Sequence, residues 1–469
     1  MLSIETILEA TGGSAAFAGV SGFSGISIDS RTSKEGSIFL ALKGENHDGH
    51  DFVPQALKKC SGAIVNRDAL CADGSISGLR IADCEFPKTL ILVSDTLHAL
   101  HALARFLRKR FEGPVIGVVG SNGKTTTKEL TVSVLGMKMK VLKTEGNLNN
   151  HIGMPLCMTN LGPDIDSMVL EMGTNRPGDV AELCSIAAPD TAVITNIGYE
   201  HLEGFGSIEK VRESELEVLC CAKRAIVNAD DGFLMDGVKA RFNGEIISFG
   251  IGRKSGADVF AEDIIYTDAG AAFTLCTKGG CLPVESRLPG LFNIYNSLAA
   301  AAAGTVLGLD MADIRTGLEA FEGVSLRFKV QTIDGVVFLN DVYNANPSSM
   351  EASLTEMSRL MASRKKGRAI AVLGDMLELG GFGTEAHKEI GRKLLAMRVD
   401  MLIAVGPLMI HAAAEFGSGA VCVNSSDEGA AMLAEVAREG DIVLIKGSRG
   451  MRMEKVLENA GRGGTVNAV

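Results

Sequence analysis

Short apolar runs alternate with helical stretches from about residue 90 onward, and this alternation constrains the fold more than any other feature. It is typical of α/β units, in which helices join the strands of a mostly parallel sheet. The runs form two series. The first is PVIGVVG (114–120), SMVLEMG (167–173), TAVITNIG (191–198) and RAIVNAD (224–230), and the second is VVFLNDVYNANP (336–347), RAIAVLGDM (368–376), DMLIAVG (400–406) and DIVLIKGSRG (441–450). We therefore predict an α/β fold with two parallel sheets.

The chain has 469 residues, which is too long for one core and indicates several domains of about 100 to 200 residues each. The first 85 or so residues carry shorter, irregular strands rich in glycine and charge. We predict a small N-terminal α/β domain (1–85), a central P-loop ATPase-like domain with a parallel sheet (86–323) and a C-terminal Rossmann-like α/β domain (324–469). The alanine-rich segment 293–309 should form a closely packed helix of the central domain.

The composition limits the partners. Hydrophobic residues make up 46% of the chain, which supports packed cores, and the net charge of -11 gives no basic footprint for nucleic acid. The start of the sequence has no basic segment before an apolar core, and no window approaches about 18 uninterrupted apolar residues. We expect a cytoplasmic monomer with neither nucleic-acid nor membrane partners.

The 10 cysteines are scattered and include no Cys-x-x-Cys pair. We predict buried free thiols, rather than disulfides or a zinc site, which is consistent with a reducing cytoplasm.

Residues 120–125, Gly-Ser-Asn-Gly-Lys-Thr, lie between the first apolar run and a helical stretch. They are not a standard Walker A loop, because Asn122 stands where that pattern, counted from Gly117, requires its second glycine. The context is still that of a phosphate-binding loop, in which glycines admit the anion, a lysine meets the outer phosphates and a threonine ligates magnesium. The predicted ATP or GTP site comprises Gly120, Asn122, Gly123, Lys124, Thr125 and Thr126. The alternative is a tight turn with a surface lysine.

Two further polar residues follow strands of the same series, Glu171 in LEMGTN and His201 in GYEHLEG. A carboxylate in this place suits magnesium, and a histidine can be a further ligand. The alternatives are a helix-cap or surface carboxylate and a hydrogen-bonded loop histidine. Asn149 and Asn150, in the loop 145–155, suit a neutral polar ligand or phosphate, although asparagine is also a common turn residue.

Together these segments resemble the Mur ligases, ATP-dependent enzymes that form amide bonds in peptidoglycan precursors. The segment 341–350 is the most discriminating, because sister ligases that add a single amino acid carry a different sequence there. Within the family the chain is similar to members that join D-alanyl-D-alanine to UDP-N-acetylmuramoyl-tripeptide. The resemblance spans the chain in DSR (29–31), KGENHDGHDF (43–52), GSNGKTTTKE (120–129), GNLNNHIGMP (146–155), LEMGTN (170–175), TNIGYEHLEGFGS (195–207), PGLFNIYNSLAA (289–300), NDVYNANPSSMEASL (340–354), VLGDMLELG (372–380) and IKGSRGMRME (445–454).

The resemblance implies roles for the domains. The N-terminal domain would bind the UDP-sugar, and the central domain would bind ATP and Mg²⁺ with Asn293 and Asn296 near the adenine. The C-terminal domain would close over the site and bring Arg327 toward the phosphates and Asp341 toward the ribose. The implied substrate residues are Ser30, Arg31, Lys43, Gly44, Asp48, His50, Asn149, Asn150, Tyr343, Asn344, Asn346 and Lys446. The implied metal ligands are Thr125, Glu171 and His201, and the implied catalytic residues are Lys124, Glu171, His201 and Glu215.

The family reaction begins with transfer of the ATP γ-phosphoryl group to the terminal carboxylate of the tripeptide. The resulting acyl phosphate has a good leaving group, and the amine of D-alanyl-D-alanine attacks it. Lys124 and magnesium would neutralise charge on the phosphoryl group, and domain closure would exclude water.

One departure from the family pattern lies at residue 215. The family usually has a lysine there that carbon dioxide carbamylates, whereas our alignment places Glu215 at this position. We predict that Glu215 supplies the carboxylate directly, although its side chain is shorter than the carbamate. The alternative is a solvated helix on which Glu213, Glu215 and Glu217 all face water.

Two smaller departures affect the adenine side and the hinge. Phe292 stands where a histidine is usual and cannot donate a hydrogen bond, and Leu326 replaces a small glycine before Arg327.

Two rival interpretations of the function remain. One is another ligase of the superfamily, of the tripeptide-forming or folylpolyglutamate type, and the other is a catalytically silent nucleotide-binding regulator.

Overall fold

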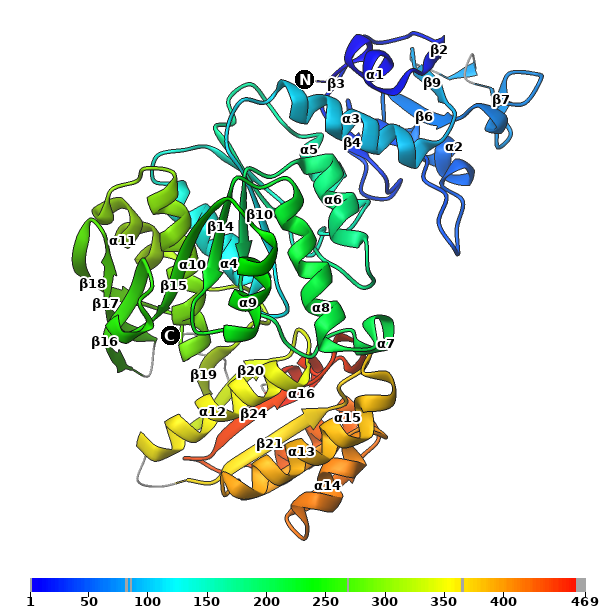
Figure 1. Cartoon of the computed structure of the whole chain (residues 1–469). Helices are drawn as coiled ribbons and strands as arrows, with labels where there is room; N and C mark the ends of the chain where they lie inside the picture. Colours follow the sequence, from blue (N-terminus) through cyan, green and yellow to red (C-terminus); the bar gives the residue numbers. More distant parts are fainter. Residues whose placement is uncertain (1, 81–82, 85–86, 268–269, 364–366, 461–469) are drawn as a thin grey trace.

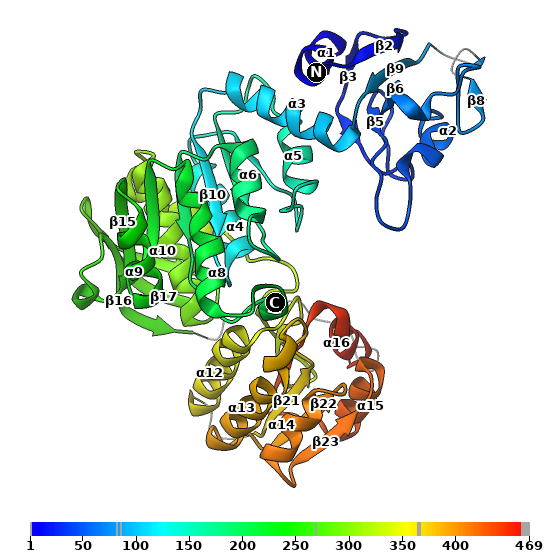
Figure 2. The same ribbon diagram turned by 45° about the vertical axis from the view of Figure 1, so that its right-hand side comes forward.

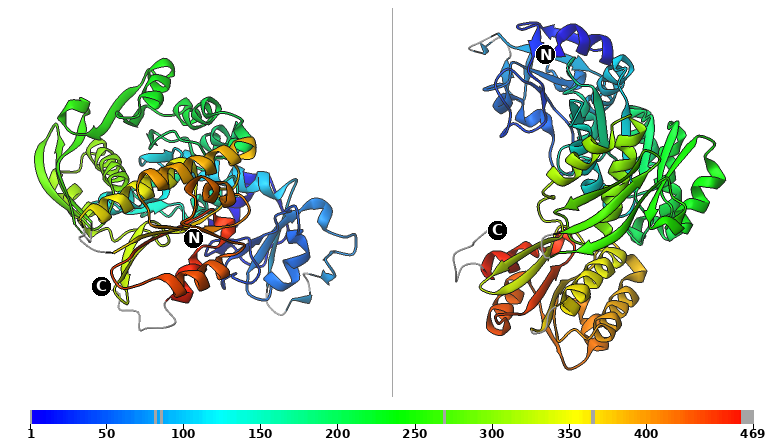
Figure 3. Two further views of the ribbon diagram at one scale, coloured as in Figure 1. Left: turned by 90° about the horizontal axis from the view of Figure 1, so that it is seen from below. Right: turned by 90° about the vertical axis from the view of Figure 1, so that its left-hand side faces the viewer.

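The computed structural model describes residues 2–80, 83–84, 87–267, 270–363 and 367–460, which form three α/β domains in a row (Figure 1). The N-terminal and C-terminal domains lie at opposite ends of the central domain, and Figure 2 and the right-hand view of Figure 3 keep this order. Among the described helices, none is long and apolar enough to cross a membrane.

The N-terminal sheet has five strands in the order β2 (Ser14–Phe17), β9 (Thr89–Val93), β6 (Gly62–Asn66), β5 (Ile38–Leu40) and β4 (Ile26–Ser27). Because β9 pairs with both β2 and β6, this sheet extends beyond residue 85, and we propose to move the predicted boundary past β9. The adjoining helix α3 (Thr96–Arg110) contacts α1 (Ile4–Thr11) and also α5 (Gly153–Met158) and α6 (Asp179–Ala187). It therefore joins the first two domains. The smaller elements are α2 (Val53–Ala56) and the short strands β1 (Leu2–Ser3), β3 (Gly22–Phe23), β7 (Ser75–Ile76) and β8 (Leu79–Arg80).

The central sheet has nine strands, and the four apolar runs of the first series are among them, as predicted. The order is β11 (Val141–Lys143), β12 (Ser167–Glu171), β10 (Val115–Val119), β13 (Thr191–Ile194), β14 (Arg224–Asn228), β15 (Glu245–Ile251), β16 (Val259–Tyr266), β17 (Ala271–Thr277) and β18 (Gly280–Ser286). Pairing is parallel as far as β16 and antiparallel from β16 to β18. Every residue of β10 and β12 is buried, as expected for parallel strands covered on both faces.

The predicted alanine-rich helix is α10 (Leu291–Val306), which packs against α4 (Lys124–Leu135). Ala299 to Ala303 are fully buried, and a Cβ on Gly304 would lie only 2.8 Å from Val134 Cγ1. Small side chains therefore let the two helices approach closely. The other helices of this domain are α7 (Leu202–Phe205), α8 (Ile208–Glu215), α9 (Gly232–Arg241) and α11 (Met311–Ala320).

The C-terminal sheet contains all four runs of the second series, as predicted. Its order is β19 (Lys329–Ile333), β20 (Val336–Asp341), β24 (Ile442–Lys446), β21 (Ala369–Gly374), β22 (Met401–Val405) and β23 (Ala420–Val423), with only β19 antiparallel. The register of β20 against β24 pairs Asp341 with Lys446 at the carboxyl end of both strands. The helices are α12 (Pro347–Ser363), α13 (Gly383–Ala396), α14 (Met409–Phe416), α15 (Ser426–Val436) and α16 (Glu454–Ala460).

The prediction of buried free cysteines was wrong in two respects. Cys276 and Cys281 form a disulfide, because the antiparallel register of β17 and β18 places their Cα atoms 4.1 Å apart. Among the free cysteines that the structure describes, only some are buried. Those that are exposed are Cys71, Cys220, Cys221 and Cys422.

The buried carboxylate of Asp441 joins the segments that precede β21 and β24 of the C-terminal domain, and its loss is expected to cost about 2 kcal/mol of unfolding free energy. It accepts hydrogen bonds from the backbone N–H groups of Arg368 and Arg438 and from the Arg368 guanidinium. Burial raises the pKa of Asp441, but these donors outweigh it and the pKa is lowered. The stabilisation is therefore present above the pKa of the unfolded chain, about 4, and is lost as the pH falls through the lower folded value.

Urea unfolding of the Asp441→Asn variant at pH 7 and at decreasing pH measures this contribution. The difference from the wild type should shrink below about pH 4. Asp427→Asn is the matched control, because Asp427 forms an exposed ion pair with Lys455 and should matter little. A difference for Asp441→Asn that did not depend on pH would contradict the ionic explanation.

Candidate nucleotide and ligase site

The loop between β10 and α4 is held in a fixed shape by its neighbours. Gly123 has φ +82°, and a Cβ there would lie 2.4 Å from Asn296 Oδ1, so this position requires glycine for both its conformation and its space. The carbonyl of Asn122 accepts a hydrogen bond from Thr195 Oγ1 at 2.6 Å, and its N–H donates to Asn196 Oδ1 at 3.1 Å. The backbone of the loop is thus ordered before any anion binds.

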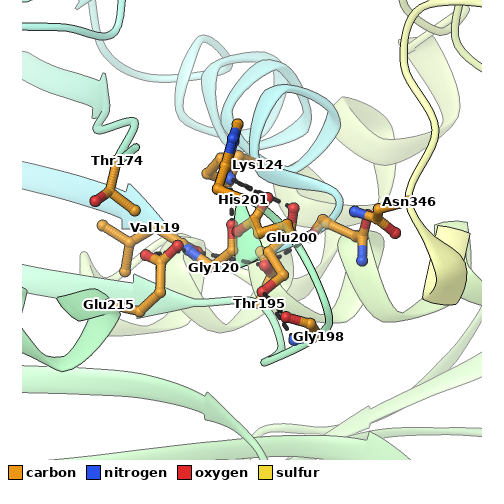
Figure 4. A network of polar contacts seen from close by, with 12 residues as sticks. Val119, Gly120, Lys124, Thr174, Thr195, Gly198, Glu200, His201, Glu215 and Asn346 are labelled. Atoms are coloured by element: carbon orange, nitrogen blue, oxygen red, sulfur yellow. Dashed lines mark hydrogen bonds and ion pairs between the residues drawn. The ribbon is translucent and has the colours of Figure 1, made fainter. Parts of the chain in front are cut away.

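Lys124, the first residue of α4, lies among carboxylates at the carboxyl ends of the parallel strands. Its Nζ is 3.5 Å from Glu200 Oε2 (Figure 4). Burial alone would lower the pKa of Lys124, but Glu200, Glu215 and Glu171 outweigh that effect and raise it. The side chain is therefore a largely buried cation at neutral pH, and the alternative of a surface lysine is wrong.

Glu215 ends α8 and is fully buried behind the loop, where its Oε2 accepts the Gly120 N–H at 2.8 Å (Figure 4). Burial raises the pKa of its carboxyl to about 8, with Lys124 opposing and Glu200 reinforcing the shift. The alternative of a wholly solvated helix face is therefore wrong for Glu215. Glu217 instead accepts hydrogen bonds from backbone N–H groups at the start of α6.

The residues around Lys124 fit a divalent cation. Glu171 Oε2, Glu200 Oε1 and Glu215 Oε1 are buried, and none of them has a hydrogen-bond partner among the residues that the structure describes. The other oxygen of Glu171 accepts from Asn149 Nδ2 at 2.8 Å. Magnesium prefers such oxygen ligands, and a nearby cation would offset the mutual repulsion of the carboxylates.

A cavity of about 650 Å³ lies between this loop and the C-terminal domain and is lined by residues of both. Asn346 Nδ2 donates to Asn122 Oδ1 at 2.9 Å, and Asn122 Nδ2 donates to Ser348 Oγ at 3.0 Å. The C-terminal domain is thus bonded directly to the phosphate-binding loop. The predicted residues that line the cavity are Asn122, Gly123, Lys124, Thr125, Thr126, Asn149, Glu171, His201, Asn293, Asn296, Arg327, Asp341, Tyr343, Asn344, Asn346 and Lys446.

Arg327 reaches the loop from the hinge between the two domains. Its Nη2 lies 3.3 Å from Thr125 Oγ1, and its guanidinium stacks on the Tyr343 ring at 3.6 Å. The preceding residue, Leu326, has φ +63°, and its carbonyl accepts the Tyr343 N–H at 3.1 Å. Leucine thus occupies here a backbone conformation that glycine adopts at little cost.

Asp341 and Lys446 form an ion pair at the floor of the cavity, with Lys446 Nζ 2.5 Å from Asp341 Oδ2. Asp341 also accepts hydrogen bonds from Ser353 Oγ and from the Phe328 N–H. Burial raises the pKa of Asp341, but Lys446 and these donors lower it, so the carboxylate is ionised. Lys446 in addition donates to Asn344 O at 3.0 Å.

The predicted adenine side is built on the first turns of α10. Asn296 Oδ1 accepts from Thr127 Oγ1 at 3.1 Å, and Asn293 Oδ1 accepts from Asn296 Nδ2 at 3.1 Å. Phe292 packs edge-on against Phe328 with ring centroids 5.1 Å apart. Phe292 therefore forms an apolar contact between α10 and the hinge, where the family usually has a hydrogen-bonding side chain.

The N-terminal candidates lie in another part of the molecule, and none of them is among the described residues that line the cavity. Arg31 is 80% exposed and pairs with Asp29. His50 is buried, with Nδ1 2.6 Å from Asp48 Oδ1 and Nε2 accepting the Asn66 N–H. The side chain of Ser30 donates to Gln55, and Lys43 and Gly44 belong to the same loop as Asp48.

Two other predicted residues sit beside the cavity rather than in it. Gly120 binds Glu215 as described, and Asn150 Oδ1 accepts the N–H groups of Ile152 and Gly153. The side chain of Asn150 therefore stabilises a turn, which was the alternative considered for this loop.

Comparison with known proteins supports the family resemblance. Residues 22–108 match the Mur ligase family, catalytic domain, residues 118–304 the Mur ligase middle domain, and residues 326–449 the Mur ligase, glutamate ligase domain. The UDP-N-acetylmuramoyl-tripeptide--D-alanyl-D-alanine ligase of Bacillus subtilis (strain 168) is 34% identical over 448 residues, covering 93% of this chain and 92% of that protein. The chain belongs to the Mur ligase family.

Other Mur ligases support the same conclusion. The enzyme of the same name from Escherichia coli (strain K12) is 32% identical, with 94% of both chains covered. The crystal structure of MurF from Acinetobacter baumannii has a TM-score of 0.85 at 30% identity over 98% of both chains. That of MurF ligase from Thermotoga maritima in complex with ADP has a TM-score of 0.78 at 31% identity, over 93% of this chain and 96% of that one. The three-domain architecture is thus that of solved Mur ligases.

Sequence reasoning missed several residues of this Mur ligase site. Glu200 is buried against Lys124, and Ser348 and Thr195 hold the loop through Asn122. Glu200 had a usable signal, because it immediately precedes His201 after a buried strand. Ser348 had none, because its contact joins residues far apart in the sequence.

Proposed function

We propose that this Mur ligase joins D-alanyl-D-alanine to UDP-N-acetylmuramoyl-tripeptide in the cytoplasm, using ATP and releasing ADP and phosphate. The observation that carries the proposal is the bonding of Asn122 in the phosphate-binding loop to Asn346 and Ser348. Through this contact, the segment that is characteristic of dipeptide-adding relatives lies next to the nucleotide site. The relatives named above also carry this activity in their names.

The chemistry starts from a carboxylate, which is a poor acyl donor because an amine does not displace oxide. Phosphorylation of the tripeptide carboxylate by ATP provides a leaving group, and the dipeptide amine then forms the amide. Lys124 neutralises charge on the transferring phosphoryl group, and Arg327 reaches the phosphates from the C-terminal side. Burial of this region between two domains keeps water from the acyl phosphate.

Magnesium supplies charge neutralisation and alignment of the phosphates when it is bound. Thr125, Glu171 and His201 are the proposed ligands, and Glu215 adds a carboxylate behind the loop. Oε2 of Glu171 lies 3.8 Å from Lys128 Nζ but accepts no hydrogen bond, and Oε1 of Glu215 accepts none from the described residues, which supports this assignment.

The remaining substrate contacts are assigned by domain. Ser30, Arg31, Lys43, Gly44, Asp48 and His50 are proposed to serve the UDP-sugar. Asn293, Asn296 and Asp341 serve the nucleoside of ATP, and Tyr343, Asn344 and Lys446 serve nucleotide and dipeptide. The residues assigned to the nucleoside and to the dipeptide all line one cavity, which supports these two assignments.

Phosphate release from ATP tests the function, with UDP-N-acetylmuramoyl-tripeptide and D-alanyl-D-alanine supplied together and each omitted in turn. Release should require both substrates and equal the pentapeptide nucleotide formed. Release without either substrate, or no release at all, would indicate another ligase of the superfamily or a nucleotide-binding regulator.

A further inference from the structure

His201 is held by a residue of the other domain. Its Nδ1 lies 2.6 Å from Oε2 of Glu378, which follows β21 in the C-terminal domain. A backbone hydrogen bond also joins the same two segments, because the Glu203 N–H donates to the Glu378 carbonyl at 3.1 Å. His201 and Glu378 both have positive φ angles, +47° and +63°, so the chain turns sharply on each side of the contact.

Apolar packing fixes this meeting point. Leu202 and Phe205 of α7 are buried in the same hydrophobic cluster as Met376 and Leu379, on either side of Glu378. A short helix of the central domain is therefore part of the C-terminal core. The position of His201 is set by the docking of the C-terminal domain and not by the central sheet alone.

This contact also determines which ring nitrogen of His201 is available. A carboxylate can only accept, so Nδ1 carries the proton, and in the neutral ring the lone pair of Nε2 is left for another partner. His201 lines the cavity beside Lys124 and Glu200 (Figure 4). Metal-binding histidines commonly donate their second N–H to a carboxylate, which fixes the tautomer and the ring orientation.

We propose that Glu378 is a positioning residue that orients His201 Nε2 toward the metal–nucleotide site, so that this ligand is in place only when the C-terminal domain is docked. The inference rests on the proposed function of the nucleotide site. It adds a long-range requirement, because a residue outside the cavity controls a group inside it. The affinity for the metal then depends on the contact between His201 and Glu378 of the docked C-terminal domain.

The test measures Mn²⁺ binding by electron paramagnetic resonance in the presence of a non-hydrolysable ATP analogue. Glu378→Ala should weaken Mn²⁺ binding by roughly 10- to 100-fold, the usual effect of losing such a partner. Glu378→Gln should stay close to the wild type, because its amide oxygen accepts the same hydrogen bond. Glu385→Ala is the matched control, since Glu385 is an exposed carboxylate of α13 that pairs with Arg392.

The outcomes separate the inference from the proposed function. Equal Mn²⁺ affinity of Glu378→Ala and the wild type would overturn the positioning role. An equal loss in Glu378→Gln and Glu378→Ala would also overturn it, because the charge and not the hydrogen bond would then matter. A wild-type protein that bound no Mn²⁺ with the analogue would overturn the proposed metal–nucleotide site, and the inference with it.

Discussion

Replacing Lys124 with alanine is expected to lower kcat for amide formation by roughly 10²- to 10³-fold, because phosphoryl transfer depends on positive charge placed at the developing transition state. The ammonium group is pre-oriented by Glu200, and its side chain is only 14% exposed, so solvent replaces it poorly. Steady-state kinetics with all three substrates give the change in kcat. Titration with an ATP analogue separates this effect from weaker nucleotide binding.

Two controls make the Lys124 result specific. Lys138→Ala removes an exposed lysine just after α4 that pairs with Asp313, and it should leave kcat unchanged. Thermal unfolding of Lys124→Ala must also be recorded, since the buried carboxylate of Glu200 loses its counter-charge. A folded Lys124→Ala protein with wild-type kcat would contradict the catalytic role.

Replacing Glu215 with alanine is expected to reduce kcat by a similar factor, because it removes a buried carboxylate that contacts the phosphate-binding loop. Glu215→Lys is the more informative variant. It restores the residue usual in the family, and an uncharged or carbamylated side chain is tolerated here better than a second ammonium beside Lys124. We expect this variant to be inactive after carbon dioxide is stripped and to recover with bicarbonate.

The wild-type enzyme should not respond to bicarbonate. Glu213→Ala is the matched control, because Glu213 is an exposed glutamate of the same helix that pairs with Arg241. If the wild type itself lost activity on stripping and regained it with bicarbonate, with Lys210 or Lys223 found modified, Glu215 would not be the replacement for the carbamate.

The parts of the fold that depend on local sequence were predicted correctly. The buried strands β10 and β21 are continuous runs of apolar residues and glycine, and β12 has an apolar centre between Ser167 and Glu171, because parallel strands are covered on both faces. The phosphate-binding loop was recognisable from its glycines between such a strand and a helix. In each case the deciding information lies within about a dozen residues.

Features that depend on long-range register were not predictable in this way. Cys276 and Cys281 meet because β17 and β18 pair in one particular register, which their spacing alone does not fix. Glu378 meets His201 only because α7 packs into the core of another domain. The chemistry of each residue was visible in the sequence, whereas its partner was determined by tertiary packing.

Leu326 holds the hinge in a strained backbone conformation while the C-terminal domain is docked. Its left-handed backbone costs a non-glycine residue roughly 1 to 2 kcal/mol, and the docked C-terminal domain maintains it through the hydrogen bond from Tyr343. A rotation that returned Leu326 to an ordinary conformation would recover that energy. The strain at Leu326 therefore offsets part of the free energy with which the C-terminal domain docks on the central domain.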